Sequence, residues 1–306
     1  MPTTTATRLA FRARSMGAAI APGEVELRVH GVYSRAINLE MEGWDLLASI
    51  MGPGGEGLPQ AIALETETNF RGWELERGDE GFLDAGFLRL MGRRVSIEVE
   101  LQGSRREGPE EPPRIADLGP AFEAAVVQLA KEQSIRSCDL RIGALLFGEA
   151  GVGAMGERLT ASARALAVAT LGGGELRASI RRLVGLGPGL TPAGDDFLCG
   201  FMAAANCSAR ELVDAIGEAA EEGIPATNEI SGSLLRCAAR GLFPRDLRRA
   251  AEAIASEEES KAARSILRLC SLGHSSGADT ATGFLFGLFV FLHSALTAGT
   301  TACNYQ

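Results

Sequence analysis

The spacing of apolar residues changes once along this chain, and the change divides it into a strand-rich part and a helix-rich part. In the first third, apolar and polar residues alternate, as at 25–29 and 95–101. Alternation with a period of two is typical of half-buried strands. Short apolar runs at 36–39, 46–50 and 61–64 are separated by glycine turns. Short strands of this kind predict a small β-rich domain, either a barrel or a sandwich.

Residues 102–114 are rich in proline, glycine and charge, and we interpret them as a linker. After them the apolar spacing lengthens to the helical period. Helices are predicted at 159–171, 176–184, 211–222, 231–240, 246–255 and 260–269, and from about 276. The sequence therefore predicts an α+β protein. Residues 1–22 form a loose arm, 23–101 the β-rich domain, and 115–306 a mainly helical domain that carries the candidate site.

Composition limits the function classes. Hydrophobic residues make up 46% and charged residues 23% of the chain, which is typical of a globular protein with a sizeable core. The net charge of −9 argues against general nucleic-acid binding. The apolar run at 283–292 is short and interrupted, so we predict a helix buried in the core and no membrane span. The absence of Cys-x-x-Cys pairs favours a reduced, cytoplasmic protein. The six cysteines are Cys138, Cys199, Cys207, Cys237, Cys270 and Cys303.

A glycine-rich loop at 185–194 leads into one of the predicted helices. Gly185, Gly187 and Gly189 allow backbone angles and close approaches that folding alone does not require here. We interpret the main-chain N–H groups of residues 187–194, together with the helix N-terminus, as a site for a phosphate or carboxylate. The spacing matches neither a Walker A loop nor the dinucleotide-binding pattern.

Two adjacent carboxylates, Asp195 and Asp196, fall in the first turn of this helix, which Thr191 and Pro192 are expected to begin. The simplest alternative is that these acids only complement the helix dipole. That explains the acids but leaves the glycines of the loop unexplained, so we favour a role in ligand binding.

The pattern Gly-x-Asp-x-x-x-Gly-Phe occurs twice in the helical part, and it aligns Asp196 with Asp279 and Gly200 with Gly283. Carboxylate and glycine are four residues apart and share one helix face. The repeat predicts two helices that cross near the glycines, with both aspartates close together at converging helix starts. A capping arrangement of Ser276 with Asp279 is the alternative reading of the second copy.

A third polar stretch, Thr227, Asn228 and Ser231, begins a further predicted helix. Taken alone, it is explained by ordinary helix capping. Its interest is that these three side chains could line the same pocket as the two aspartates.

Three carboxylates beside an anion site create an electrostatic conflict, because an anionic substrate would be repelled. A divalent cation would resolve it, and oxygen ligands from Asp, Thr and substrate suit magnesium. A basic side chain could do so instead, and the sequence leaves both alternatives open. The basic candidates are Arg35, Arg181 and His274. His274 is also a candidate general base.

The chain is similar to the AllH-like family. The residues that carry the resemblance are 34–39, 187–196, 227–231 and 273–279. The resemblance extends from about residue 25 to about residue 295. The family usually has a serine before Gly-Asp-Asp, where this chain has Ala193.

The resemblance implies a subunit of an oxamate carbamoyltransferase complex, alongside proteins like FdrA and AllG. That activity interconverts oxamate and carbamoyl phosphate with oxalurate and phosphate in anaerobic allantoin (purine) degradation. We therefore expect a small anionic substrate at the loop and the converging helix starts. The alternative is a non-catalytic scaffold or small-molecule sensor whose chemistry lies on a partner chain.

The predicted site combines these stretches. The catalytic candidates are Asp196, Asp279 and His274, and the candidate metal ligands are Asp195, Asp196 and Asp279. Magnesium is the only cofactor candidate. The predicted substrate-binding residues are Gly187, Gly189, Leu190, Thr191, Gly194, Thr227, Asn228, Ser231, Ser275, Ser276, Gly277 and Arg35.

Overall fold

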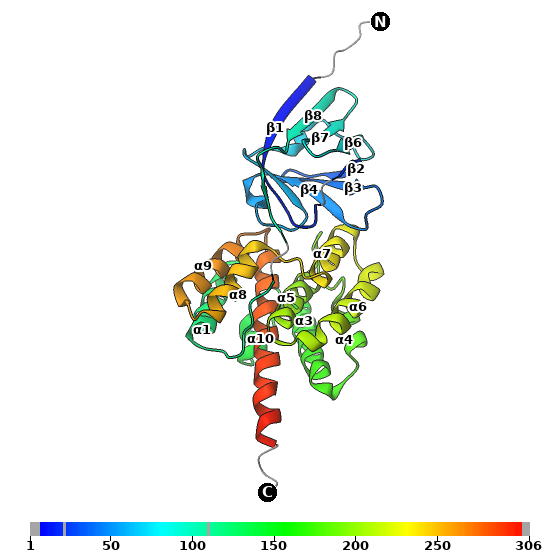
Figure 1. Cartoon of the computed structure of the whole chain (residues 1–306). Helices are drawn as coiled ribbons and strands as arrows, with labels where there is room; N and C mark the ends of the chain where they lie inside the picture. The colour runs from blue at the N-terminus through cyan, green and yellow to red at the C-terminus, as the bar shows by residue number, and fades with distance from the viewer. Residues whose placement is uncertain (1–6, 21–22, 109–110, 302–306) are drawn as a thin grey trace, which may run out of the picture. The chain divides into compact units, whose positions relative to one another are not determined.

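The computed structural model describes residues 7–20, 23–108 and 111–301, with side chains except at 173 and 294–301. The chain divides into two compact units, Met1–Pro109 and Glu110–Gln306. The division falls inside the predicted linker, whose limits stay a prediction. In Figure 1 the strands run from blue to cyan and the helices from green to red. Cys303, residues 1–6 and 21–22 of the predicted arm, and residues 109–110 of the linker lie outside the described residues.

The N-terminal unit is a closed barrel of eight strands, so the α+β prediction with a β-rich first domain is confirmed. The barrel order is β5-β4-β3-β2-β6-β7-β8-β1, and β1 returns to β5. The strands are β1 (Thr7–Met16), β2 (Val25–Val32), β3 (Ala36–Met41), β4 (Leu47–Met51), β5 (Ala61–Leu64), β6 (Glu80–Leu83), β7 (Phe87–Met91) and β8 (Val95–Glu100), with a short β9 (Arg105–Arg106) beside β1.

Strand β1 corrects the prediction of a loose arm over residues 1–22, which is wrong for 7–16. Its first half pairs in parallel with β8, from Thr7 to Arg12. A register shift after Ala13 turns its second half onto β5 in antiparallel pairing. One strand thus bonds to both neighbours and closes the barrel, which leaves no unpaired sheet edge there.

The barrel interior is filled by alternate apolar side chains. On β8, Val95, Ile97 and Val99 are buried while the residues between them are partly exposed. Phe11 of β1 stacks on Trp73 with ring centroids 4.4 Å apart. These inward residues give the unit a hydrophobic core of its own.

The second unit is helical, and the predicted helices are confirmed with ends within a few residues of those predicted. The exception is the helix predicted at 159–171, because α3 begins earlier, at Gly153. The α-helices in the described part of this unit are α1 (Pro120–Ile135), α2 (Ile142–Leu146), α3 (Gly153–Val168), α4 (Leu176–Leu183), α5 (Ala193–Ser208), α6 (Val213–Gly223), α7 (Glu229–Ala239), α8 (Arg245–Ala255), α9 (Glu259–Cys270) and α10 (Ser276–Thr301).

Helices α5 and α10 form the centre of this unit and pack closely on each other (Figure 1). Phe201 of α5 lies 4.9 Å from Phe291 of α10, measured between ring centroids. Side chains on all faces of both helices are buried, as expected for helices apolar around their circumference. The prediction of a buried core helix at 283–292 is confirmed. Among the residues searched, no helix is long and apolar enough to cross a membrane.

Candidate functional site

Helices α5 and α10 cross at two glycines, as the repeated sequence pattern predicts. A Cβ atom on Gly200 would lie 1.9 Å from the carbonyl oxygen of Thr280. A Cβ atom on Gly283 would lie 1.9 Å from the carbonyl oxygen of Phe197. Thr280 and Phe197 each follow the repeated aspartate by one residue, so the two contacts are equivalent. The crossing is reciprocal and leaves no room for any side chain at either glycine.

The beginnings of the two helices repeat the same construction. A Cβ atom on Gly194 would lie 2.1 Å from Leu183 O, and one on Gly277 would lie 1.8 Å from Leu269 O. The N–H of Gly194 donates to Leu186 O at 2.8 Å. Gly277 makes the equivalent bond at 3.1 Å in its own copy. These two glycines therefore serve close packing, and an anion could use their N–H groups only if these bonds broke.

The two copies thus form an internal pseudo-twofold pair, each consisting of a helix, a turn and a second helix. The first copy contains α4 and α5, and the second contains α9 and α10. The segment between the turn and the second helix is three residues longer in the first copy than in the second. It runs from 187 to 194 in the first copy and from 273 to 277 in the second. The predicted convergence of two helix starts follows from this pairing.

Asp195 is a structural anchor between the glycine loop and α7. Its buried carboxylate accepts hydrogen bonds from the Gly185 N–H at 2.7 Å and the Thr227 hydroxyl at 2.5 Å. It also accepts one from the Ser231 hydroxyl at 2.6 Å. Three donors satisfy most of the acceptor capacity of this carboxylate. Two of the predicted binding residues, Thr227 and Ser231, therefore hold the aspartate that fixes the loop.

Asp196 has a different environment from its neighbour. Its side chain is buried, and its Oδ2 atom has no hydrogen-bond partner. Burial raises the pKa of Asp196 to about 7, and the charge of Asp195 acts in the same direction. Hydrogen bonds from the Ser276 and Thr191 side chains oppose the rise. Asp196 can therefore gain or lose a proton near neutral pH.

Asp279 is the equivalent carboxyl group on α10. It is buried, and its Oδ1 atom has no hydrogen-bond partner. Burial raises its pKa well above the usual range, and the charges of Asp196 and Asp139 raise it further. A hydrogen bond from the Ser275 side chain opposes the rise. The Coulomb interaction agrees with the prediction that Asp196 and Asp279 are neighbours.

The loop before α5 lies at the surface and needs its glycines. Gly185, Gly187 and Gly189 all have positive φ angles, which other residues rarely adopt. A Cβ atom on Gly185 would lie 2.3 Å from Ala226 O, so the loop passes close to the segment before α7. Leu190 at the loop tip is 52% exposed. The predicted anion contacts of the loop stay a prediction.

Three further residues of the predicted site are Asn228, His274 and Arg35. Asn228 is exposed, and its side chain accepts hydrogen bonds from two N–H groups at the start of α7, which matches the capping alternative. His274 is exposed, and its carbonyl oxygen accepts a bond from Arg136 at 3.4 Å. Arg35 lies in the turn between β2 and β3 of the other unit. Their roles toward a substrate stay predictions.

The three aspartates do not form a metal cluster in the described structure. Within the searched residues, no group of three or more His, Cys, Asp or Glu side chains is arranged to hold a metal ion. The physical reason is that Asp195 is turned toward Gly185, Thr227 and Ser231, and its oxygens are already hydrogen-bonded there.

Comparison with known proteins bears on this construction. No solved structure matches the chain. One protein family does match, over a segment that runs from the end of α4 into α10. Residues 183–288 match the AllH family. The family is described as oxamate carbamoyltransferase subunit AllH. The resemblance to AllH is therefore confirmed over this segment. Both aspartates and both crossing glycines lie inside it.

The segment that matches AllH, residues 183–288, is not fully symmetric at its two carboxyl groups. Ser276 precedes Gly277 and donates to Asp196 across the pair. The equivalent residue before Gly194 is Ala193, which has no hydroxyl group. Asp279 therefore lacks the cross-copy donor that Asp196 has. Asp196 and Asp279 therefore differ in the donors around them, although each keeps one oxygen without a partner.

Some side chains that support the matched segment could not be identified from the sequence. Gln133 of α1 is buried and donates to the Thr282 hydroxyl of α10 at 2.8 Å. Its side-chain oxygen accepts from the Ile142 N–H at 2.9 Å. Asp139 influences the pKa of Asp279 from the same region. These residues belong to no motif and lie more than a hundred positions from α10.

Proposed function

We propose that this chain is a subunit of an oxamate carbamoyltransferase complex and that its small substrate binds where α5 and α10 begin. The observation that carries the proposal is the pair Asp196 and Asp279. Each has a buried oxygen without a hydrogen-bond partner, within the segment that matches AllH. Buried polar atoms are nearly always satisfied in folded proteins, so two orphans at one place support a ligand site.

The raised pKa values would reduce the repulsion between the carboxylates and an anionic substrate. Two buried carboxyl groups side by side do not both ionise readily. At neutral pH the pair retains protons, because burial raises the pKa of both carboxyl groups. A neutral carboxyl group can donate a hydrogen bond to an anionic substrate. The site can then accept a phosphate or carboxylate without a cation, while the helix N-termini favour negative charge.

Carbamoyl transfer has a defined requirement that this pair could meet. The amide nitrogen of oxamate forms a bond to the carbamoyl carbon, the carbon–oxygen bond to phosphate breaks, and phosphate leaves with the electron pair. The attacking nitrogen loses one proton. Asp196, with a pKa of about 7, is suited to accept that proton. Asp279, held neutral, is suited to donate a hydrogen bond to the substrate.

The complete activity would involve partner subunits. The family description names a subunit, so other chains are expected in the complex. We propose FdrA-like and AllG-like proteins as these partners and a cytoplasmic location. The five cysteines in the described residues are all free thiols, which supports a reducing compartment. In this proposal the barrel, including Arg35, binds a partner subunit.

Asp196→Asn and Asp279→Asn test the proposal in the assembled complex. Each is expected to lower the rate of carbamoyl phosphate turnover about 100-fold or more, because positioned acid–base groups typically contribute that much. Above the Asp196 pKa of about 7, Asp196→Asn should leave the melting temperature unchanged or higher. The reason is that the buried charge destabilises the fold there. Loss of turnover would then not reflect unfolding.

The matched control is Asp214→Asn, at an exposed aspartate in the first turn of α6. It removes a carboxylate from the first turn of a helix outside the site, and turnover should not change. Normal turnover in both site variants would contradict the proposal. Full turnover by the partner proteins without this chain would favour the scaffold or sensor alternative.

A further inference from the structure

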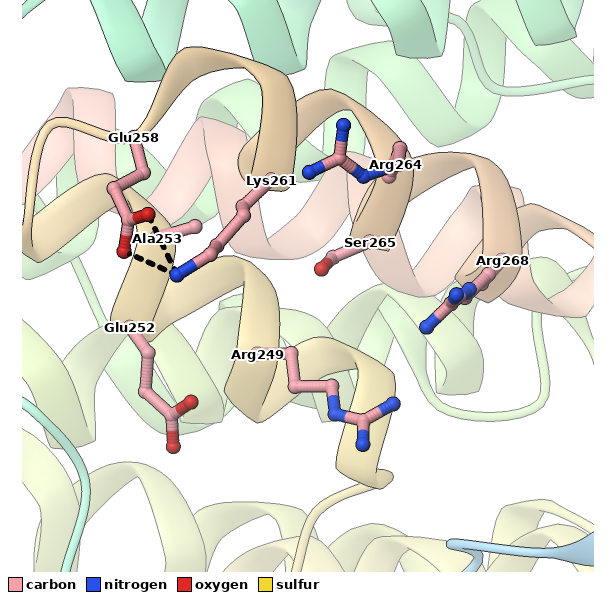
Figure 2. Close-up of a pocket in the computed structure, with 8 residues that line it drawn as sticks. All are labelled: Arg249, Glu252, Ala253, Glu258, Lys261, Arg264, Ser265 and Arg268. Carbon is pink, nitrogen blue, oxygen red and sulfur yellow. Dashed lines mark hydrogen bonds and ion pairs between the residues drawn. The ribbon is translucent and has the colours of Figure 1, made fainter.

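A groove with a cavity of about 380 Å³ lies between α8 and α9, built from residues other than those of the proposed site. Cavities of this size hold small molecules. Figure 2 shows the side chains around it. The lining residues are Arg249, Glu252, Ala253, Glu258, Lys261, Arg264, Ser265 and Arg268.

The glutamates and the arginines of this groove lie on different halves of it. Figure 2 shows Glu252 and Glu258 on one half with Lys261, whose ammonium group pairs with Glu258 at 2.6 Å. The arginines lie on the other half, around Ser265 (Figure 2). Arg249 contacts Asp246 at the long distance of 3.4 Å. The arginine half is therefore only weakly neutralised by the protein.

Arg264 and Arg268 are the least neutralised cations of the groove. Within the described residues, no ion pair or side-chain hydrogen bond involves either guanidinium. They are four residues apart on one face of α9, where like charges destabilise a helix. In a chain of net charge −9, such a cluster is a local positive patch that favours an anion.

The floor of this half carries a hydroxyl group. Ser265 lies between the two arginines in sequence and is only 6% exposed. In Figure 2 its side chain points into the groove. A hydroxyl beneath forked guanidinium donors is a suitable arrangement for a tetrahedral oxyanion, because arginine presents paired N–H groups to phosphate.

We propose that this groove binds a small molecule through a compact phosphate group, with Arg249, Arg264 and Arg268 as its ligands and Ser265 at the base. The two glutamates at the other half would repel an extended polyanion such as nucleic acid, so the ligand is compact. The proposal is independent of the proposed function, because none of these residues belongs to the paired carboxyl site.

The test is calorimetric titration of the whole chain with inorganic phosphate, with ionic strength held constant by chloride. The double variant Arg264→Gln/Arg268→Gln should bind phosphate about tenfold more weakly or worse, because two charge-assisted donors are lost. Both side chains are exposed, so the fold should tolerate the change. An unchanged melting temperature would confirm this.

The matched control is Arg182→Gln. Arg182 precedes Leu183 on α4 as Arg268 precedes Leu269 on α9, so it is the pseudo-twofold equivalent outside the groove. It should bind phosphate as the wild type does. Three results would overturn the proposal: no phosphate binding by the wild type, equal binding by the double variant, or an equal loss in Arg182→Gln.

Discussion

Alanine at Gly200 is expected to destabilise the helical unit by about 3 kcal/mol or more, at the upper end of what overpacking does. The added Cβ would lie 1.9 Å from Thr280 O and 2.7 Å from Phe284 N. Both are backbone atoms of the other central helix, so neither can move without separating α5 from α10. Gly283→Ala should have the same effect from the opposite side. Urea unfolding followed by far-ultraviolet circular dichroism measures both.

Gly217→Ala is the matched control for this prediction. Gly217 is also buried in a helix, but the nearest atoms to its added Cβ are 3.5 Å away, which is ordinary contact. It should be neutral or stabilising by about 0.5–1 kcal/mol, because glycine is unfavourable inside helices. If Gly200→Ala changed the free energy of unfolding no more than Gly217→Ala does, α5 and α10 would not cross as closely as described.

Asp195→Ala is expected to lower the free energy of unfolding by about 3 kcal/mol or more, because each buried donor left without an acceptor costs about 1–3 kcal/mol. The substitution leaves the Gly185 N–H and the hydroxyls of Thr227 and Ser231 without their acceptor. The glycine loop would lose its attachment to the start of α7. The measurement is again denaturant unfolding of the whole chain.

Asn228→Ala provides the comparison at the same helix start. The Asn228 side chain accepts from the Ile230 and Ser231 N–H groups at the start of α7, so its loss should cost about 1 kcal/mol, the usual value of a helix cap. An equal loss of free energy of unfolding for both substitutions would show that Asp195 contributes no more than an ordinary helix cap. A much larger effect for Asp195→Ala would support its role as the anchor of the loop.

The sequence predicts much of the fold because its periodic patterns are local. The alternation in Val95, Ile97 and Val99 predicts β8, and the helical spacing predicts the elements from α3 onward. Strand β1 has the same alternation in Leu9, Phe11 and Ala13, but the nearby Arg8, Arg12 and Arg14 suggest a polar arm. Its partners lie about fifty to ninety residues away, and only the closed barrel shows why these arginines face outward.

The repeated pattern predicts the helix crossing because glycines at matched positions imply close approach. It does not distinguish Asp195 from Asp196. On a helix, neighbouring residues point about 100° apart, so adjacent aspartates face different surroundings. Asp195 meets three donors, whereas Asp196 faces α10 with one oxygen unsatisfied. That difference depends on α7 and α10, which no local pattern describes.

Asp196 and Asp279 are expected to form one coupled carboxyl pair. Carbon-13 NMR titration of the Asp279 carboxyl in the wild type and in Asp196→Asn tests it most directly. In the wild type, Asp279 should titrate well above the usual range for aspartate. In Asp196→Asn its pKa should fall, because a neighbouring negative charge is removed. An ordinary Asp279 pKa in the wild type, or one unchanged by Asp196→Asn, would contradict the account.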